Sequence, residues 1–436
     1  MRALRVERCV LALCLLVILA LPACSTVAQK PRNPNIIFIL ADDLGYGDLA
    51  CYGQQLTKTP NLDRMAAEGM RFTDFYAGCP VCTPSRASLL TGYDMGHSSI
   101  RRGADRPLRE EDITIAEVLK DAGYATAVIG KWHLGDIGSS GSPTRQGFDY
   151  FLGFDAGCGS GSEYYFPTVI CQNEQAIPVE PGTYQPDLLM RDALNFISKN
   201  KDRPFFLYLT PMLPHAPYEI PSIGQYESEP WSEEDKRFAA MVTYLDTGVG
   251  QVLDRLEDLK IDDDTVVFFA SDNGPEGTSI FKNAGALNGI KRTLYEGGIR
   301  VPFIARWPGQ IAPGQVVVEP VAAWDFLKTA AELGGASVGW GNGVSFLPTL
   351  LGEKRNFSRT LYWEFPITKG RGFMQAVRLG NWKGLQIATF KKKKTKTTFE
   401  LYDLNNDLAE ENDVAAQHPE IVEEMRAIMA REHTDK

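Results

Sequence analysis

The sequence contains little histidine and only one closely spaced pair of cysteines. Five histidines occur in 436 residues, and the single C-x-x-C stretch, Cys79 to Cys82, has no second copy and no suitably spaced cysteine–histidine pair. A zinc ribbon needs such a second pair. A thioredoxin-like dithiol would begin a helix directly after a strand, whereas Thr83 and Pro84 follow Cys82. These observations disfavour a structural zinc site and a redox dithiol. The third interpretation is that Cys82 alone has a chemical role.

Positive charge is also scarce. The chain has 45 lysines and arginines against 55 aspartates and glutamates, a formal net charge of −10. This balance argues against a general nucleic-acid or polyanion binder, although a local basic cluster can still dock an anion. We expect no nucleic-acid partner.

The apolar run near the N-terminus is too short to span a bilayer comfortably. The basic stretch MRALRVER precedes CVLALCLLVILALPAC, which is the pattern of an export signal over residues 1–24. Leu21 to Cys24 resembles a bacterial lipoprotein cleavage box in which Cys24 is acylated, but Pro22 is unusual there, and ordinary cleavage nearby is the alternative. Both predict an exported protein, periplasmic or at the cell surface, with a possible lipid anchor on the membrane through Cys24.

Strand-like and helix-like segments alternate through most of the remaining chain. The unbroken apolar run Ile36 to Leu40 indicates a buried parallel strand, and the helix that starts near Pro60 and ends at Gly69 follows it. This alternation predicts an α/β fold, a large mostly parallel sheet flanked by helices, over residues 33–335. Short strand-like pieces and one final helix predict a smaller C-terminal α+β domain over residues 340–436.

One basic run lies inside that second region. KKKKTK, residues 391 to 396, stands between two strand-like segments. A solvated hairpin tip is the favoured interpretation, and contact with a sulfated polymer is the alternative.

Acidic and amide side chains follow two of the predicted strands. Asp42 and Asp43 end the first strand, and Asp272 and Asn273 end a later one. Ligands of parallel sheets bind beyond the carboxyl ends of the strands, and oxygen donors of this kind favour calcium or magnesium over zinc. The alternative is that both pairs cap helices or form turns.

Several motifs then converge on one family. CTPSRASLLTG resembles the C-x-P-S-R signature of type I sulfatases in the alkaline phosphatase superfamily, whose cysteine a maturation enzyme oxidises to formylglycine. GYATAVIGKWH resembles the second signature of the family, and LPHAPY, GIKRTLYEGGIRVPFI, ADDLGYGD and SDNG resemble its histidine, lysine and metal segments, in the family's order. The resemblance covers nearly the whole exported chain, without a departure at any catalytic or metal position.

The resemblance implies a sulfuric ester hydrolase, arylsulfatase-like, with an alkaline-phosphatase-like fold. It implies calcium, rather than magnesium, held by Asp42, Asp43, Cys82 in its modified form, Asp272 and Asn273. It also implies these catalytic residues: Cys82 as the formylglycine precursor, Arg86, Lys131, His133, His215 and Lys291. Cations are required to stabilise the negative charge of a reacting sulfate ester. His215 with Lys291 resembles the family's general acid. His133 would deprotonate the second hydroxyl of the hydrated aldehyde. Taken singly, each has an alternative as a surface cation or a structural histidine.

The substrate is less well specified. His97, Arg101 and Arg102 follow the nucleophile segment and are candidate substrate ligands, with surface-loop residues and a framework salt bridge as the alternative. GCGSGSEYYFP, residues 157–167, is a candidate loop whose aromatic side chains stack on a sugar or aryl ring. The resemblance implies a carbohydrate sulfate, because exported bacterial members of this family often desulfate polysaccharides. The rival functions are a phosphonate or phosphodiester hydrolase of the same superfamily, and a glycan-binding protein without catalysis.

The other cysteines are expected to be structural. An oxidising compartment permits disulfides, and Cys158 with Cys171 is a plausible local pair. Cys79 is expected to be a packed thiol or the disulfide partner of Cys51.

Overall fold

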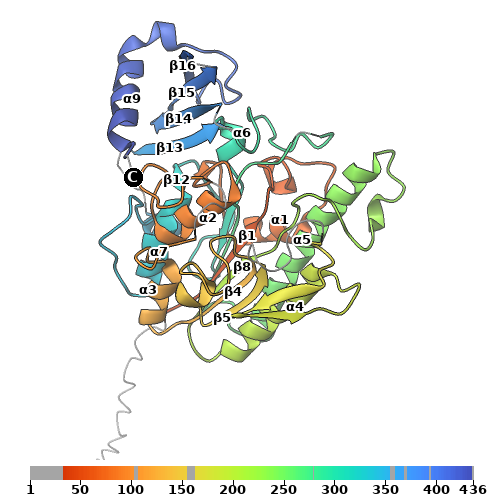
Figure 1. Cartoon of the computed structure of the whole chain (residues 1–436). Helices are drawn as coiled ribbons and strands as arrows, with labels where there is room; N and C mark the ends of the chain where they lie inside the picture. Colours follow the sequence, from red (N-terminus) through yellow and green to blue (C-terminus); the bar gives the residue numbers. More distant parts are fainter. Residues whose placement is uncertain are drawn as a thin grey trace, which may run out of the picture. The chain divides into compact units, whose positions relative to one another are not determined.

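A ten-stranded sheet forms the centre of the computed structural model (Figure 1). The structure describes residues 33–102, 107–154, 163–277, 279–353, 359–367, 371–391 and 394–434. The strands of the large sheet are, in spatial order, β11 (Gln315–Val317), β2 (Met70–Phe72), β10 (Phe303–Arg306), β9 (Thr265–Ser271), β1 (Asn35–Ala41), β8 (Phe205–Thr210), β4 (Ala125–Lys131), β5 (Tyr150–Phe154), β6 (Val169–Gln172) and β7 (Gln175–Pro178).

The five central strands, from β9 to β5, are all parallel, and the antiparallel pairs lie toward the edges. The predicted mostly parallel sheet is thus confirmed. The central strands are buried along their whole length, apart from the first residue of β5, which explains why their sequences are unbroken apolar runs.

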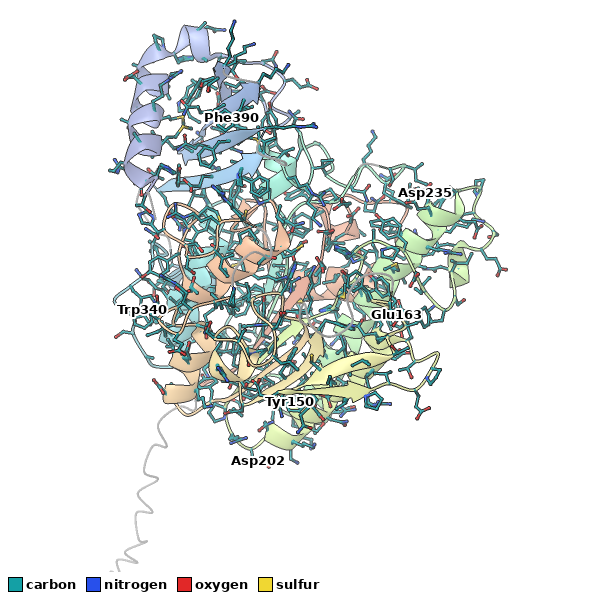
Figure 2. All side chains as sticks on the ribbon, in the orientation of Figure 1. Tyr150, Glu163, Asp202, Asp235, Trp340 and Phe390 are labelled. Carbon is teal, nitrogen blue, oxygen red and sulfur yellow. The ribbon has the colours of Figure 1, made fainter. Side chains whose placement is uncertain are left out.

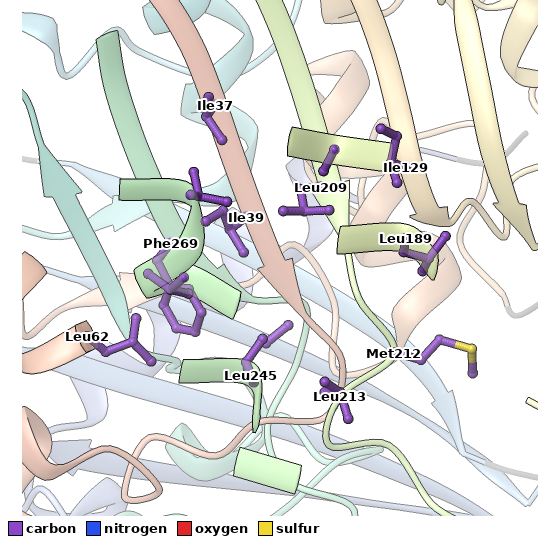
Figure 3. Packing of buried hydrophobic residues seen from close by; sticks show 14 of the residues in the cluster. Ile37, Ile39, Leu62, Ile129, Leu189, Leu209, Met212, Leu213, Leu245 and Phe269 are labelled. Atoms are coloured by element: carbon purple, nitrogen blue, oxygen red, sulfur yellow. The ribbon is translucent and has the colours of Figure 1, made fainter. Parts of the chain in front are cut away.

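Alternate residues of each strand pack into two separate cores. Ile36 and Phe38 of β1 face α2 (Cys82–Thr91), α3 (Ile115–Asp121) and α7 (Phe326–Leu333). Ile37 and Ile39 face α1 (Pro60–Glu68), α4 (Gln185–Asn200) and α5 (Glu233–Asp258), as Figure 3 shows for Leu189 and Leu245. Helices therefore cover both faces of the sheet, as the alternating sequence pattern predicts.

A second, four-stranded antiparallel sheet lies in the C-terminal part. It consists of β13 (Thr360–Ile367), β14 (Gly372–Leu379), β15 (Trp382–Lys391) and β16 (Lys394–Asp403). Helix α9 (Pro419–Glu432) covers one face through Met425, Ile428 and Met429. The other face packs on the large unit, where the indole of Trp363 donates a hydrogen bond to the carbonyl of Ala77 at 2.9 Å.

The remaining elements are short. They are β3 (Phe75–Tyr76) paired with β12 (Val321–Ala322), and helices α6 (Glu296–Ile299) and α8 (Leu347–Leu350). Phe346 and Leu350 belong to the core of the large sheet, so the small sheet begins only with β13. No helix in the described ranges is both long and apolar enough to cross a membrane.

Candidate active site

Two adjacent strands bring the predicted oxygen donors together. Ala41 at the end of β1 lies opposite Ser271 at the end of β9, so Asp42 and Asp43 emerge at the same level as Asp272 and Asn273. The backbone N–H of Asp43 donates to Oδ1 of Asp272 at 3.2 Å. Asp43 has a φ of 63°, a left-handed conformation that aspartate tolerates better than most residues.

Cys82 reaches this group from the first turn of α2. Its Sγ lies 3.4 Å from Oδ1 of Asp42 and 3.9 Å from Oδ1 of Asp43. Pro84 fits the first turn because the N–H groups there have no helical partner. Burial raises the pKa of the Cys82 thiol well above its usual value, and the neighbouring carboxylates of Asp272 and Asp42 add to the effect. The side chain is therefore a neutral thiol and a poor nucleophile as it stands.

The neighbouring cysteine does not form a redox pair with it. Cys51, Cys79 and Cys82 are all free thiols, so the predicted alternative of a Cys51–Cys79 disulfide is wrong and the packed thiol is correct. Cys51 and Cys79 belong to different hydrophobic clusters, which explains why no disulfide joins them. Cys171 is disulfide-bonded, and its predicted partner Cys158 lies outside the described residues.

Two buried cations neutralise part of the acidic group. Arg86, also on α2, donates through Nε and Nη2 to Oδ2 of Asp272 at 3.0 and 2.7 Å, and through Nη1 to the carbonyl of Lys131 at 2.9 Å. Nζ of Lys131, at the end of β4, lies 2.7 Å from Oδ2 of Asp42. Burial alone would raise the pKa of Asp42, but Lys131, His215, Arg86 and Lys291 hold it well below the usual range. Asp42 is therefore ionised.

A third cation and a histidine approach from other loops. Nζ of Lys291 lies 2.6 Å from Oδ2 of Asp43 and 3.0 Å from Glu276. His215, in the loop after β8, has its Nε2 3.5 Å from the same oxygen of Asp43, and its side chain is 22% exposed. His215 is therefore partly accessible to solvent.

His133 is the other histidine that the motifs single out. It follows β4, and Oγ1 of Thr83 lies 3.2 Å from Nδ1. Burial, together with the positive charges of Lys131 and Arg86, lowers the pKa of His133 to about 3. A neutral imidazole at physiological pH can accept a proton but cannot donate one as an acid.

The residues present fit a divalent cation. Asp42, Asp43, Cys82 and Asp272 each offer one ligand atom, and these atoms all lie within 4.8 Å of one another in buried positions. Oδ1 of Asn273 is buried and accepts no hydrogen bond. A buried amide oxygen without a partner is costly, and a hard cation would satisfy it together with the carboxylates.

The three predicted substrate ligands have different surroundings. Arg101 donates to Glu364 at 3.1 Å, to the carbonyl and hydroxyl of Thr434, and to the carbonyls of Gly96 and Ser98. These contacts favour the alternative, a framework salt bridge, for Arg101. Nδ1 of His97 lies 2.7 Å from Asp94, and Arg102 is exposed.

The predicted aromatic loop is only partly described. Residues 157–162 lie outside the described ranges. Tyr165 is fully buried and donates to the carbonyls of Met212 and His215, so it supports the histidine loop instead of stacking on a ligand. Tyr164 packs edge-on against His215 with ring centroids 6.1 Å apart.

Two contact residues had not been expected from the sequence. Thr83 contacts His133, and Glu276 pairs with Lys291. Thr83 lies within the C-T-P-S-R motif, so the sequence could have indicated that it lies at the site. Glu276 has no such signal, because only the fold brings it to Lys291.

Comparison with known proteins identifies the family that has this set of residues. A model of the sulfatase family matches residues 34–336, which include all the predicted catalytic and metal-site residues. The chain belongs to the sulfatase family. A second model, described as N-sulphoglucosamine sulphohydrolase, C-terminal, matches residues 289–435 of this sulfatase.

Individual relatives agree. The sulfatase is 38% identical to human arylsulfatase A over 405 residues, covering 84% of this chain and 76% of the relative. It is 35% identical to N-acetylgalactosamine-6-sulfatase of the dog, covering 82% and 72%. Hydrolysis of sulfate esters is therefore the activity of the chain, and the predicted enzyme class is confirmed.

Solved structures show the same fold. The crystal structure of Ps i-CgsB in complex with k-i-k-neocarrahexaose superposes with a TM-score of 0.80 at 29% identity, covering 92% of each chain. The phosphonate monoester hydrolase of Agrobacterium radiobacter gives a TM-score of 0.68 at 20% identity, covering 92% of this chain and 96% of that one, a likeness of fold alone.

Proposed function

We propose that this sulfatase removes sulfate from a carbohydrate outside the cytoplasm, using a formylglycine made from Cys82 and a calcium ion. The observation that carries the proposal is the buried, neutral thiol of Cys82, which faces two carboxylates and is ringed by Arg86, Lys131 and Lys291. A thiol in this state needs a chemical change before it can attack sulfur.

Formylglycine at position 82 would supply, once hydrated, one hydroxyl that gives its proton to Asp272 or Asp43 and bonds to sulfur while the S–O bond to the alcohol breaks. Deprotonation of the second hydroxyl would then expel sulfate and restore the aldehyde. Asp42, Asp43, Asp272 and Asn273 would hold the cation together with this residue, and a calcium ion bound there would supply Lewis-acid polarisation of a sulfate oxygen. The oxygen-only set from the four side chains favours calcium, with magnesium the weaker candidate.

Three cations prepare the site for an anion. Arg86 and Lys131 are buried and fixed by their bonds to Asp272 and Asp42. Lys291 is equally buried and bonded to Asp43. Because these charges are already oriented, they stabilise the negative charge of the reacting sulfate without reorganising.

The two histidines divide the proton transfers. His215 is partly exposed beside Asp43 and donates a proton to the oxygen of the departing alcohol. His133 is neutral and accepts the proton of the remaining hydroxyl at residue 82. Thr83 holds the imidazole of His133 close to that residue.

Carbohydrate sulfates are proposed from the relatives. One relative is named for N-acetylgalactosamine 6-sulfate, and a structural neighbour was crystallised with a neocarrahexaose. Among the substrate-ligand candidates we retain His97 and Arg102 and give Arg101 a framework role. The exported location rests on the signal-like residues 1–24, with lipidation of Cys24 as a further proposal, and maturation requires a formylglycine-generating enzyme as partner.

Mass spectrometry and a sulfate-release assay test the proposal together. The protein is produced with a formylglycine-generating enzyme, and the tryptic peptide from Phe72 to Arg86 is expected to carry an aldehyde at residue 82. Sulfate release from 4-nitrophenyl sulfate should disappear in Cys82→Ala. An unmodified thiol in an active enzyme would refute the nucleophile, and faster turnover of 4-nitrophenyl phenylphosphonate than of the sulfate would favour the phosphonate hydrolase.

A further inference from the structure

The tip of the β15–β16 hairpin carries a row of lysines on one face. In the register of the hairpin, Lys391 lies directly opposite Lys394, and Thr389 lies opposite Lys396. Residues that face each other across two strands share a side, and so do residues two apart along a strand. Lys391, Lys394 and Lys396, named here the lysine face, therefore point to the same side.

That side is the one that packs against the catalytic unit. Leu385 and Ile387 have the same parity as Lys391 along β15, and they belong to the buried cluster that includes Val81 and Tyr295. Val81 directly precedes Cys82 in the chain. The hydroxyl of Tyr295, four residues after Lys291, donates to Glu400 of β16 at 2.7 Å. The lysine face thus continues the surface that contacts both segments carrying active-site residues.

The lysines of this face are uncompensated. Lys120, Lys131, Lys236, Lys291 and Lys383 each pair with a carboxylate. Within the described ranges, no carboxylate pairs with Lys391, Lys394 or Lys396, and all three are exposed. Like charges directly opposite each other destabilise a hairpin, so this arrangement works against folding unless an anion neutralises it.

The hairpin leaves the lysine face open to solvent. Phe390, labelled in Figure 2, is 46% exposed, and by strand alternation it lies on the opposite side from Lys391. It therefore does not cover the lysines. The whole chain carries a net charge of −10, so the lysine face is a local site of attraction for an anion on a protein that is acidic overall.

We infer that the lysine face binds the sulfated polysaccharide chain whose ester enters the active site, so that the polymer contacts the enzyme at two places. This inference rests on the proposed carbohydrate sulfatase activity and specifies a polymer as substrate. The charges of enzyme and substrate are complementary. A polysaccharide that carries many sulfates presents further anionic groups beyond the ester being cleaved, whereas an aryl sulfate presents no further anionic group.

The test compares a triple variant, Lys391→Gln with Lys394→Gln and Lys396→Gln, with a control that removes the same charge elsewhere. The control is Lys58→Gln with Lys201→Gln and Lys260→Gln, three lysines that are exposed in other parts of the molecule. The full-length, matured enzyme is passed over immobilised ι-carrageenan and chondroitin 6-sulfate in a rising salt gradient. Initial rates are measured on the same soluble polymers and on 4-nitrophenyl sulfate.

The hairpin variant should elute from both immobilised polymers at a lower salt concentration than the wild type and the control variant. Its KM on the polymer that is hydrolysed should rise about tenfold, the order expected from losing three exposed ion pairs. Its kcat, and its kcat/KM on 4-nitrophenyl sulfate, should stay unchanged.

Equal retention and equal polymer KM in the two triple variants would overturn the inference while leaving the sulfatase activity in place. If the wild type releases sulfate neither from the polymers nor from 4-nitrophenyl sulfate, the proposed function is refuted, and the salt gradient still decides whether the lysine face binds sulfated chains. A circular dichroism melting curve confirms that both variants are folded.

Discussion

Lys131 and Asp42 form a buried ion pair in which Nζ lies 2.7 Å from Oδ2, while Oδ1 of the same carboxylate lies 3.4 Å from the sulfur of Cys82. Asp42 directly follows β1 and Lys131 ends β4, and these two strands are separated in the sheet by β8. One carboxylate therefore links the position of the nucleophile to a cation two strands away. This link fixes the side chains before any substrate arrives.

Replacing Lys131 by methionine should destabilise the metal-free protein. Removing one partner of a buried pair leaves the other charge uncompensated, which costs about 3–5 kcal/mol. We expect the free energy of unfolding in EDTA to fall by about this amount, and by less in calcium, because the cation supplies the missing positive charge. Urea unfolding in both buffers measures the difference.

Lys120→Met is the matched control for this experiment. Lys120 pairs with Asp149 at 2.8 Å, but both side chains are more than 40% exposed. An exposed pair contributes at most about 1 kcal/mol, and calcium should not change that. Equal losses in the two variants would show that the buried Lys131–Asp42 pair contributes no more to stability than an exposed pair.

Calcium should bind with an affinity that depends on Asn273. The buried Oδ1 of this residue accepts no hydrogen bond, so Asn273→Ala should weaken binding at least tenfold, or about 1.4 kcal/mol. Calorimetric titration of chelator-treated protein measures this without reference to activity. Asp94→Asn, in the separate group formed with His97 and Glu432, should leave the titration unchanged. An unaltered affinity in Asn273→Ala would remove that residue from the site.

That the candidate metal donors come together could be predicted from the sequence, because of where the strands end. Asp42 and Asp272 each follow an uninterrupted apolar run, and parallel neighbours place such ends at one edge of a sheet. The family motifs added Cys82, Arg86 and His133. The α/β alternation and the antiparallel C-terminal strands were likewise visible, because the periodicity changes between them.

The pairings between these residues could not be predicted. Asp43 and Lys291 are 248 positions apart, and Arg101 and Glu364 are 263 apart. No local pattern links residues at such separations, so a framework arginine and a substrate-binding arginine look alike in sequence. The low pKa of His133 could not be predicted either, because its burial and the nearby cations appear only in the fold.

His133 should remain neutral over the whole working range of pH. Its pKa is lowered from 6.5 to about 3, first by burial and then by Lys131 and Arg86. A depressed histidine pKa means that the folded state favours the neutral form, so this contribution to stability is present above pH 6.5 and is lost as pH falls toward 3. The imidazole proton resonance of His133, assigned by its absence in His133→Gln, should not shift between pH 5 and 8.

Lys131→Met provides a second measurement on the same resonance. Removing that positive charge should move the midpoint of His133 upward, because Lys131 is one of the causes of the low pKa. A wild-type midpoint near 6.5 would contradict the buried, neutral base and the proton transfer proposed for it.

Arg101 should stabilise the fold without contributing to substrate affinity. Its guanidinium joins the loop that follows α2 to Glu364 of β13 and to Thr434 near the end of the chain, and its side chain is only 15% exposed. Arg101→Gln leaves Glu364 with a buried charge and should lower the free energy of unfolding by about 2–4 kcal/mol. The KM for 4-nitrophenyl sulfate and for the sulfated polymers should not change in the folded fraction. Arg102→Gln, one residue later and exposed, should show the reverse: unaltered stability and a raised KM for the sulfated polymers. A large increase in KM for Arg101→Gln at unchanged stability would restore Arg101 as a substrate ligand, since a framework role alone moves stability and not KM.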